Sequence, residues 1–199
     1  DFELSLYDTN PAAIIGLDKA FIAGSRLDNL VSCWIGLKAL VDSSSVDTQL
    51  LICNDHEEVG SGSFAGARSD LLESVLMRMV GDAAKFSSVM SRSLLVSADN
   101  AHGLHPNFLE KHDQSHGPVL NAGPVLKFNA NQSYATNSET AAILNLAARN
   151  KNIPMQSFVS RSDMGCGSTI GPLTSTRLGV KALDVGIPTF GMHSIRELA

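Results

Sequence analysis

The segment Leu94-Leu95-Val96-Ser97-Ala98-Asp99 joins a short apolar run to a carboxylate that follows it directly. A run of this length, with polar residues close behind it, predicts a buried β-strand over residues 94–97. Similar runs on both sides of this segment predict further strands. They lie at residues 1–7, 21–23, 49–53, 125–129, 156–159 and 181–185.

Amphipathic stretches separate these predicted strands. Apolar residues recur at helical spacing over 29–41 and 69–80, and Ser138 or Asn137 is a suitable N-cap for a helix over 139–150. A fourth helix is expected through residues 176–178, after a Gly-rich turn. Strands that alternate with helices predict an α/β fold of three layers, with a mixed or mostly parallel sheet flanked by helices.

The composition fits an ordinary globular protein and argues against two kinds of partner. The 199 residues are 44% hydrophobic and 18% charged, with a net charge of −5. Nucleic-acid binding requires clustered positive charge, and the sequence has no basic stripe. The apolar runs are also far too short to cross a membrane.

Three widely spaced cysteines, Cys33, Cys53 and Cys166, form neither a disulfide framework nor a thiolate metal motif. Cys33 and Cys53 lie in predicted apolar elements, so we expect both to be small core residues. This cysteine usage suits a reducing compartment, and we expect a cytoplasmic protein.

Both ends of the sequence suggest a piece of a longer protein. No initiator Met is present, and residues 1–6 have the pattern of a strand already under way. Ser194-Ile195-Arg196-Glu197 has the S-x-x-E form of a capping box, which predicts the start of a helix. The sequence stops at Ala199, too soon for such a helix to be stable.

Acidic residues and one histidine follow several of the predicted strands. They are Asp28 after the 21–23 strand, Glu57 and Glu58 after the 49–53 strand, Asp99 after the 94–97 strand, and His193 beyond the 181–185 strand. In open α/β sheets, ligands bind beyond the carboxyl ends of the strands. We therefore expect these groups to share one crevice.

Carboxylate and imidazole groups in this arrangement are suitable zinc ligands. A catalytic zinc keeps one position open for water, and a bridging Asp can hold two ions about 3.5–4 Å apart. In the Glu57-Glu58 pair, one glutamate would bind metal while the other serves as general base, and Gly60 would supply the necessary turn. Each residue alone has a more ordinary interpretation, as a turn or cap residue, an exposed acidic pair or a structural histidine.

Five motifs in order along the chain give it a specific resemblance to the aspartyl aminopeptidase family. They are Ser25-Arg26-Leu27-Asp28-Asn29, Asp55-His56-Glu57-Glu58-Val59-Gly60-Ser61, Ser97-Ala98-Asp99-Asn100-Ala101-His102, Gly167-Ser168-Thr169-Ile170-Gly171-Pro172 and Met192-His193-Ser194-Ile195-Arg196-Glu197. The resemblance runs from Asp1 to Ala199. It implies a zinc-exopeptidase-like fold that binds two divalent metal ions per subunit, Zn²⁺ above all.

The resemblance also implies a role for each acidic motif residue. Asp28 would bridge the two metals, and the peptide bond after it would be cis. Glu57 would be the general base. Glu58 and His193 would bind one metal, and Asp99 would bind the other.

Substrate contacts are implied at His102, Lys127, Tyr134 and Gly167. An ammonium group at Lys127 would suit an acidic first residue of the substrate, as a point charge that faces a carboxylate. A loop histidine at position 102 and a solvated strand lysine at position 127 stay open as alternatives. The glycines around Cys166 would let the substrate approach the backbone closely, and Cys166 itself lacks the partners of a nucleophile.

One histidine ligand of the family has no counterpart in this sequence, because the family carries it near the N-terminus of the full protein. This chain would then be unable to form the complete two-metal site alone. The family also carries an inserted domain that supports homo-oligomer assembly. Residues 1–8 are expected to be the exit strand of that domain, and residues 9–199 a partial catalytic domain.

The resulting hypothesis is a metal-dependent aminopeptidase that removes N-terminal residues, acidic ones above all, from peptide substrates. Two alternatives stay open: a two-metal hydrolase of N-acyl amino acids, and an oligomeric assembly or cargo protein with little turnover. A purely structural role is disfavoured, because carboxylates gathered without a cation are costly to bury.

Overall fold

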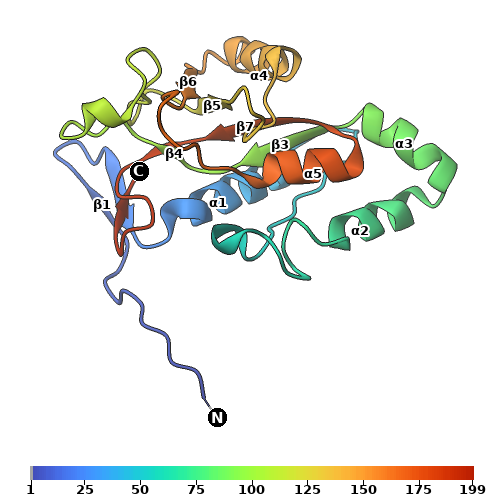
Figure 1. The fold of residues 1–199 in the computed structure, drawn as a ribbon, viewed down its shortest axis with the longest axis horizontal. Coiled ribbons are helices and arrows are strands. Elements are labelled where there is room, and N and C mark those ends of the chain that lie inside the picture. The colour runs from blue at the N-terminus through green and yellow to red at the C-terminus, as the bar shows by residue number, and fades with distance from the viewer. Residues whose placement is uncertain (1) are drawn as a thin grey trace.

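A mixed four-stranded sheet forms the centre of the structure, a computed structural model that describes residues 2–199 (Figure 1). Its strands, in spatial order, are β3 (Leu94–Ala98), β7 (Lys181–Gly186), β5 (Val125–Phe128) and β6 (Gln156–Val159). β3 runs parallel to β7 and β5 runs parallel to β6, whereas β5 and β7 are antiparallel. The α/β class with a mixed sheet is therefore confirmed.

Helices cover both faces of this sheet. Alternate residues of a strand point to opposite faces. In β7, Leu183 packs with Ala141 of α4 (Ser138–Asn150), while Asp184 lies against Gly171 in α5 (Ile170–Leu178). Figure 1 shows α4 on one side of the sheet and α5 on the other, together with α1 (Leu27–Asp42) and α2 (Leu71–Val80). The three layers match the predicted architecture.

Helix α3 (Ala83–Ser91) is an element that the sequence analysis missed. The side chain of Asp82 caps it by accepting hydrogen bonds from the N–H groups of Ala84 and Lys85. Met90 of this helix packs in an apolar cluster with Leu178 and neighbouring residues of α2. The expected cap of α4 is confirmed at Asn137, which forms a capping box with Thr140.

Short strands and turns lie in the loops beside the main sheet. β1 (Ala13–Ile15), β2 (Phe21–Gly24) and β9 (Glu197–Leu198) form an antiparallel sheet, and β4 (Ala101–His102) runs parallel to β8 (Pro188–Thr189). Two 3₁₀ turns, η1 (Glu57–Val59) and η2 (Leu109–Lys111), complete the set. Because Glu197 pairs with Gly24 just before α1, the last residues of the chain lie beside the start of that helix.

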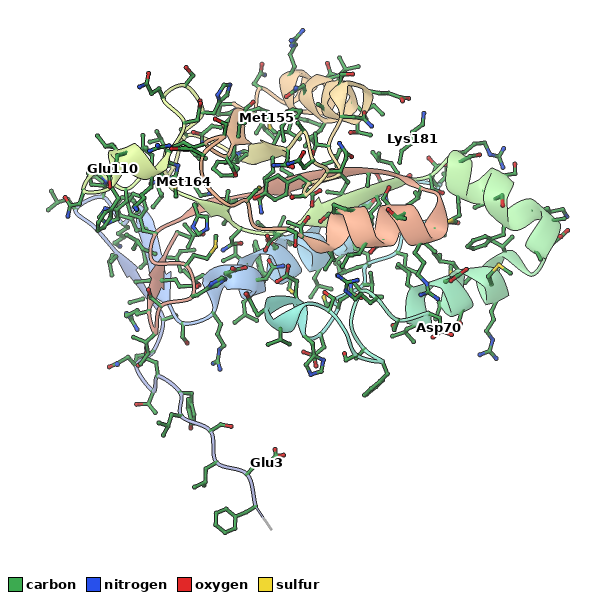
Figure 2. All side chains as sticks on the ribbon, viewed as in Figure 1. Glu3, Asp70, Glu110, Met155, Met164 and Lys181 are labelled. Carbon is green, nitrogen blue, oxygen red and sulfur yellow. The ribbon has the colours of Figure 1, made fainter. Side chains whose placement is uncertain are left out.

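Two expected strands are absent from residues 2–199. Residues 2–7 form no strand, and Figure 2 shows Glu3 on a segment that extends away from the rest of the molecule; Asp1 lies outside the described residues. Residues 49–53 form no strand either, because no strand of the described chain pairs with them. Leu50 is 43% exposed, and Cys53 is exposed where burial was expected.

The prediction of a helix that starts at Ser194 is also wrong. Glu197 begins β9, and its carboxylate binds backbone N–H groups other than that of Ser194. No helix in the described part of the chain is both long and apolar enough to span a membrane.

Asp184 ties three segments together next to the sheet. Its carboxylate is fully buried and accepts hydrogen bonds from the Ala135 N–H and the Thr169 hydroxyl, each at 2.6 Å. Its own N–H donates to the hydroxyl oxygen of Thr136 at 2.8 Å. A Cβ atom at Gly171 would lie 2.5 Å from the carboxylate, so the start of α5 packs directly on this group.

Replacing Asp184 by Asn should lower the free energy of unfolding by about 2–3 kcal/mol, because the new amide would present N–H₂ to a buried donor. Chemical denaturation measures the change. Glu139→Gln is the matched control: its ion pair with Lys181 is half exposed and should contribute less than about 1 kcal/mol. Equal stability of the Asp184→Asn and control variants would contradict the role given to Asp184.

Candidate metal centre

Asp28 is held at the start of α1 by contacts with two neighbouring segments. Its side chain is 4% exposed, and its N–H donates to the Glu197 carboxylate at 2.8 Å. The Asp28–Asn29 peptide bond is cis, as the resemblance implies. The Asn29 side chain donates to the Ala98 carbonyl at 3.0 Å, which joins this turn to the end of β3. Asp28 consequently lies beside Asp99, the residue that follows β3.

Glu58 and His193 meet Asp28 from two other segments. Glu58 lies in η1, and His193 lies between β8 and β9. The Nε2 atom of His193 is 3.3 Å from an Asp28 carboxylate oxygen and 3.0 Å from a Glu58 carboxylate oxygen. Atoms of all three residues that can bind a metal lie within 4.8 Å of one another. One cation could therefore contact all three side chains.

Asp28, Glu58 and His193, with Asp99 beside them, form a cluster whose carboxylates repel one another. Burial, followed by the nearby Asp99 and Glu58 carboxylates, raises the pKa of Asp28 to about 7. The Oδ1 atom of Asp28 is buried and has no hydrogen-bond partner in the described part of the chain. A bound cation would offset the repulsion and satisfy this oxygen, so the donor set fits a divalent ion such as zinc.

Glu57 shares η1 with Glu58 and is influenced by the same charges. Burial raises the pKa of the Glu57 carboxyl, and the Asp99 and Glu58 carboxylates raise it further, while Lys127 and His193 oppose them. Gly60 ends the turn in the left-handed region, at φ 96°, and its N–H donates to the Glu57 carbonyl at 2.9 Å. A carboxyl group with a raised pKa, next to side chains that can bind a metal, is a suitable proton acceptor.

Lys127 brings a buried positive charge to this region. Its side chain is 3% exposed, and its Nζ atom lies 2.8 Å from the Asp99 carboxylate and 5.4 Å from the centre of the Tyr134 ring. The alternative of a solvated strand lysine is therefore wrong. Tyr134 packs edge-on against Phe158 at 6.2 Å, and burial, with the Cys166 thiol nearby, raises the pKa of its phenol.

His102 and Gly167 are both exposed residues, although the neighbours of His102, Ala101 and Gly103, are buried. His102 belongs to β4, and partial desolvation lowers the pKa of its imidazole, with nearby Lys127 and His112 adding to the effect. A Cβ atom at Gly167 would meet nothing within 4 Å, so this segment faces open space. Contact of Gly167 with a substrate stays a prediction.

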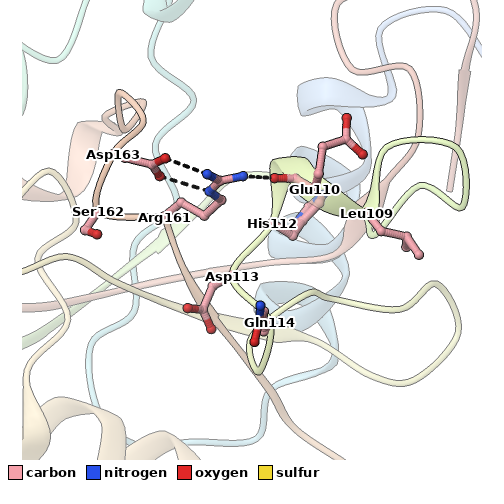
Figure 3. Close-up of a pocket in the computed structure, with 8 residues that line it drawn as sticks. All are labelled: Leu109, Glu110, His112, Asp113, Gln114, Arg161, Ser162 and Asp163. Carbon is pink, nitrogen blue, oxygen red and sulfur yellow. Dashed lines mark hydrogen bonds and ion pairs between the residues drawn. The ribbon is translucent and has the colours of Figure 1, made fainter.

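A separate cavity of about 580 Å³ opens between η2 and the segment after β6 (Figure 3). Arg161 crosses it, donating to the Asp163 carboxylate through Nε at 2.9 Å and also to the Glu110 carbonyl. Its lining contains none of the predicted site residues. It is made of Leu109, Glu110, His112, Asp113, Gln114, Arg161, Ser162 and Asp163.

Glu197 belongs to the site but was missed by the sequence reasoning. It is 3% exposed, and its carboxylate accepts the N–H groups of both Asp28 and His193. Its spacing from Ser194 matches a local helix cap, whereas one of its actual partners is distant in the sequence. The available signal was an acidic residue close behind the candidate ligand His193 within one motif.

Comparisons with known proteins identify the family of this chain. The family model described as aminopeptidase I zinc metalloprotease (M18) matches residues 1–199. A probable M18 family aminopeptidase 2 of Stutzerimonas stutzeri (strain A1501) is 60% identical over 199 residues, which are 100% of this chain and 46% of that protein. The corresponding protein of Pseudomonas aeruginosa (strain UCBPP-PA14) is 58% identical, with the same coverage. The chain thus spans less than half the length of these relatives.

Solved structures show the same fold. The chain matches one from the "Cryo-EM structure of the Ape4 and Nbr1 complex" with a TM-score of 0.91 and 40% identity, covering 97% of this chain and 39% of that one. It matches the "Structure of S. cerevesiae mApe1 dodecamer" with a TM-score of 0.83 and 30% identity, covering 97% of this chain and 45% of that one. On these grounds the chain belongs to the M18 family of aminopeptidase I zinc metalloproteases.

Proposed function

We propose that the full-length protein containing this chain is a metal-dependent aminopeptidase that removes N-terminal residues, preferentially Asp or Glu, from peptides. The observation that carries the proposal is the convergence of Asp28, Glu58 and His193, whose ligand atoms lie within 4.8 Å of one another. These residues come from three separate segments, which a local structural role does not require. Membership of the M18 family supports peptide hydrolysis as the reaction.

Two divalent ions would be held by the acidic cluster. Asp28, Glu58 and His193 would hold one ion, and Asp28 with Asp99 would provide part of the second set. The mixture of carboxylate oxygen and imidazole nitrogen suits zinc. Bound zinc would polarise the scissile carbonyl and provide a strong nucleophile near neutral pH. We expect a further ligand for the second ion from outside this chain.

Glu57 would act as the general base. It would accept a proton from the attacking water and deliver that proton to the leaving amine. Two observations support this role: Glu57 directly precedes Glu58 in η1, and its pKa is raised by burial and by the carboxylates of the cluster. A base whose pKa is closer to neutral both takes and returns a proton more readily.

Lys127 would select acidic first residues. Its ammonium group is buried and contacts both the Asp99 carboxylate, at 2.8 Å, and the Tyr134 ring, at 5.4 Å from the ring centre, so its position is fixed. A fixed positive charge beside the metal centre would favour a substrate carboxylate over an apolar side chain. Tyr134 and His102, in the same region, would complete the pocket.

We also propose that the full-length protein is a cytoplasmic homo-oligomer. A relative of 30% identity is described as a dodecamer, and three free cysteines in the described chain suit a reducing compartment. Helix α1 exposes Leu30, Trp34 and Leu37 at 56%, 64% and 53%. We assign the cover of this apolar face to the rest of the full-length protein, because the chain spans 46% of its relatives.

Glu57→Gln in the full-length protein should retain zinc but lower kcat by about 10²- to 10⁴-fold, because an amide cannot accept the proton. Hydrolysis of aminoacyl anilides and the zinc content of the same samples test this. Asp55→Asn is the matched control: this carboxylate lies in the same loop, is 71% exposed, and its loss should leave both quantities unchanged. A Glu57→Gln enzyme within a few-fold of wild type would exclude Glu57 as the base.

Lys127→Met should lower kcat/KM for Asp and Glu anilides about 10- to 100-fold more than for Leu anilide, since a charged hydrogen bond to the substrate is lost. The Leu substrate is an internal reference for any general damage from unpairing Asp99. Lys181→Met, which removes a half-exposed lysine of β7, is the control and should preserve the preference. Equal losses on acidic and apolar substrates would show that Lys127 does not select the first residue.

A further inference from the structure

The carboxylate of Glu197 is almost completely buried beside Asp28 and His193, and both of its oxygens accept hydrogen bonds. One oxygen accepts the N–H of Asp28 at 2.8 Å, and the other accepts the N–H of His193 at 2.7 Å. The side chain is 3% exposed. It forms no ion pair within the described part of the chain, so its negative charge is stabilised mainly by these two backbone donors.

The two donors belong to residues that face each other across the cluster. Asp28 stands at the start of α1, and His193 stands in the loop before β9, yet their side chains come within 3.3 Å. One carboxylate therefore fixes the backbones of two candidate ligands at the same time. A shift of either backbone would change the distance between the imidazole and the Asp28 carboxylate.

The His193 backbone needs such support. Its φ of 67° lies in the left-handed region, which non-glycine residues rarely adopt and which persists only when surrounding contacts hold it. The hydrogen bond to Glu197 is made by the N–H of this same residue. Loss of the acceptor would free the loop to relax and would move the imidazole.

The side chain of Glu197 is not required for the pairing of β9. That strand is held to β2 by backbone bonds, including a reciprocal pair between Ile22 and Ala199 at 2.7 Å and 2.9 Å. A further buried carboxylate beside Asp28 also adds to the repulsion in the cluster. A residue with an electrostatic cost and no necessary part in strand pairing indicates another role.

We infer that Glu197 is a positioning residue that holds Asp28 and His193 at the spacing needed to bind one divalent ion together. This inference rests on the proposed function for the identity of the ligands. Groups that orient metal ligands typically change metal affinity about 10- to 100-fold when they are removed. Glu197 differs from an ordinary partner of a ligand because its hydrogen bonds go to the two backbones and to neither ligand side chain.

The test uses Glu197→Gln in the full-length protein. Glutamine has one carbonyl oxygen, so it can accept only one of the two N–H groups, and its own N–H₂ would face the other. Zinc affinity, measured by competition with a chelator, should fall about 10- to 100-fold. The absorption spectrum of the Co²⁺-substituted protein should change, and at saturating zinc kcat should fall while KM stays within about twofold.

Arg196→Gln is the matched control from the adjacent position. Its guanidinium binds Asp8 and the carbonyl groups of Pro11 and Ala23, and none of the side chains of Asp28, Glu58 and His193, so zinc affinity and the Co²⁺ spectrum should stay unchanged. Wild-type zinc affinity and spectrum in Glu197→Gln would overturn the inference. Metal binding is measured without turnover, so absence of aminopeptidase activity in the wild type would refute the proposed function while leaving this comparison intact.

Hydrogen exchange on the wild-type protein tests the inference even if Glu197→Gln does not fold. The amide protons of Asp28 and His193 should be protected in the zinc-free protein, because both are bonded to a buried carboxylate. Free exchange of either amide proton would overturn the inference.

Discussion

Mutual repulsion among closely spaced carboxylates, of which Asp28 and Glu197 are buried, is the constraint on which this site depends. Asp28 lies beside Asp99, Glu58 and Glu197, and its pKa is raised to about 7 by burial and by its neighbours. The molecule supplies partial compensation through the Lys127 ammonium on Asp99 and through backbone N–H groups on Glu197. The buried Oδ1 of Asp28 still lacks a partner in the described chain, and a cation is the natural one.

The fold brings these charges together because the end of β3, the start of α1 and the loop before β9 lie close to one another. Asp99 follows β3 directly, and Asn29 binds the Ala98 carbonyl at that same strand end. β9 lies beside β2, which brings the loop that carries His193 to the start of α1. On one face of β7, Asp184 fixes the segments that contain Ala135 and Thr169, next to Tyr134 and the Gly-rich stretch.

Local patterns predicted what local forces determine. Asp99 could be placed because a short apolar run before it forms a strand, and ligands gather at strand ends. The capping of α4 by Asn137 was likewise readable from neighbouring residues. The role of Glu197 could not be predicted in this way. Its S-x-x-E spacing favours a local helix cap, whereas in the folded chain its carboxylate binds the N–H of the distant Asp28. The prediction of a strand at residues 49–53 was wrong for a related reason. A strand needs a neighbouring strand to pair with, and an apolar sequence alone does not provide one.

Anomalous diffraction at the zinc edge, from crystals of the zinc-loaded full-length protein, tests the central claim most directly. The account predicts two zinc peaks on either side of the Asp28 carboxylate, with Glu58 and His193 at one and Asp99 at the other. Zinc bound elsewhere, with Asp28, Glu58 and His193 free of metal, would contradict it.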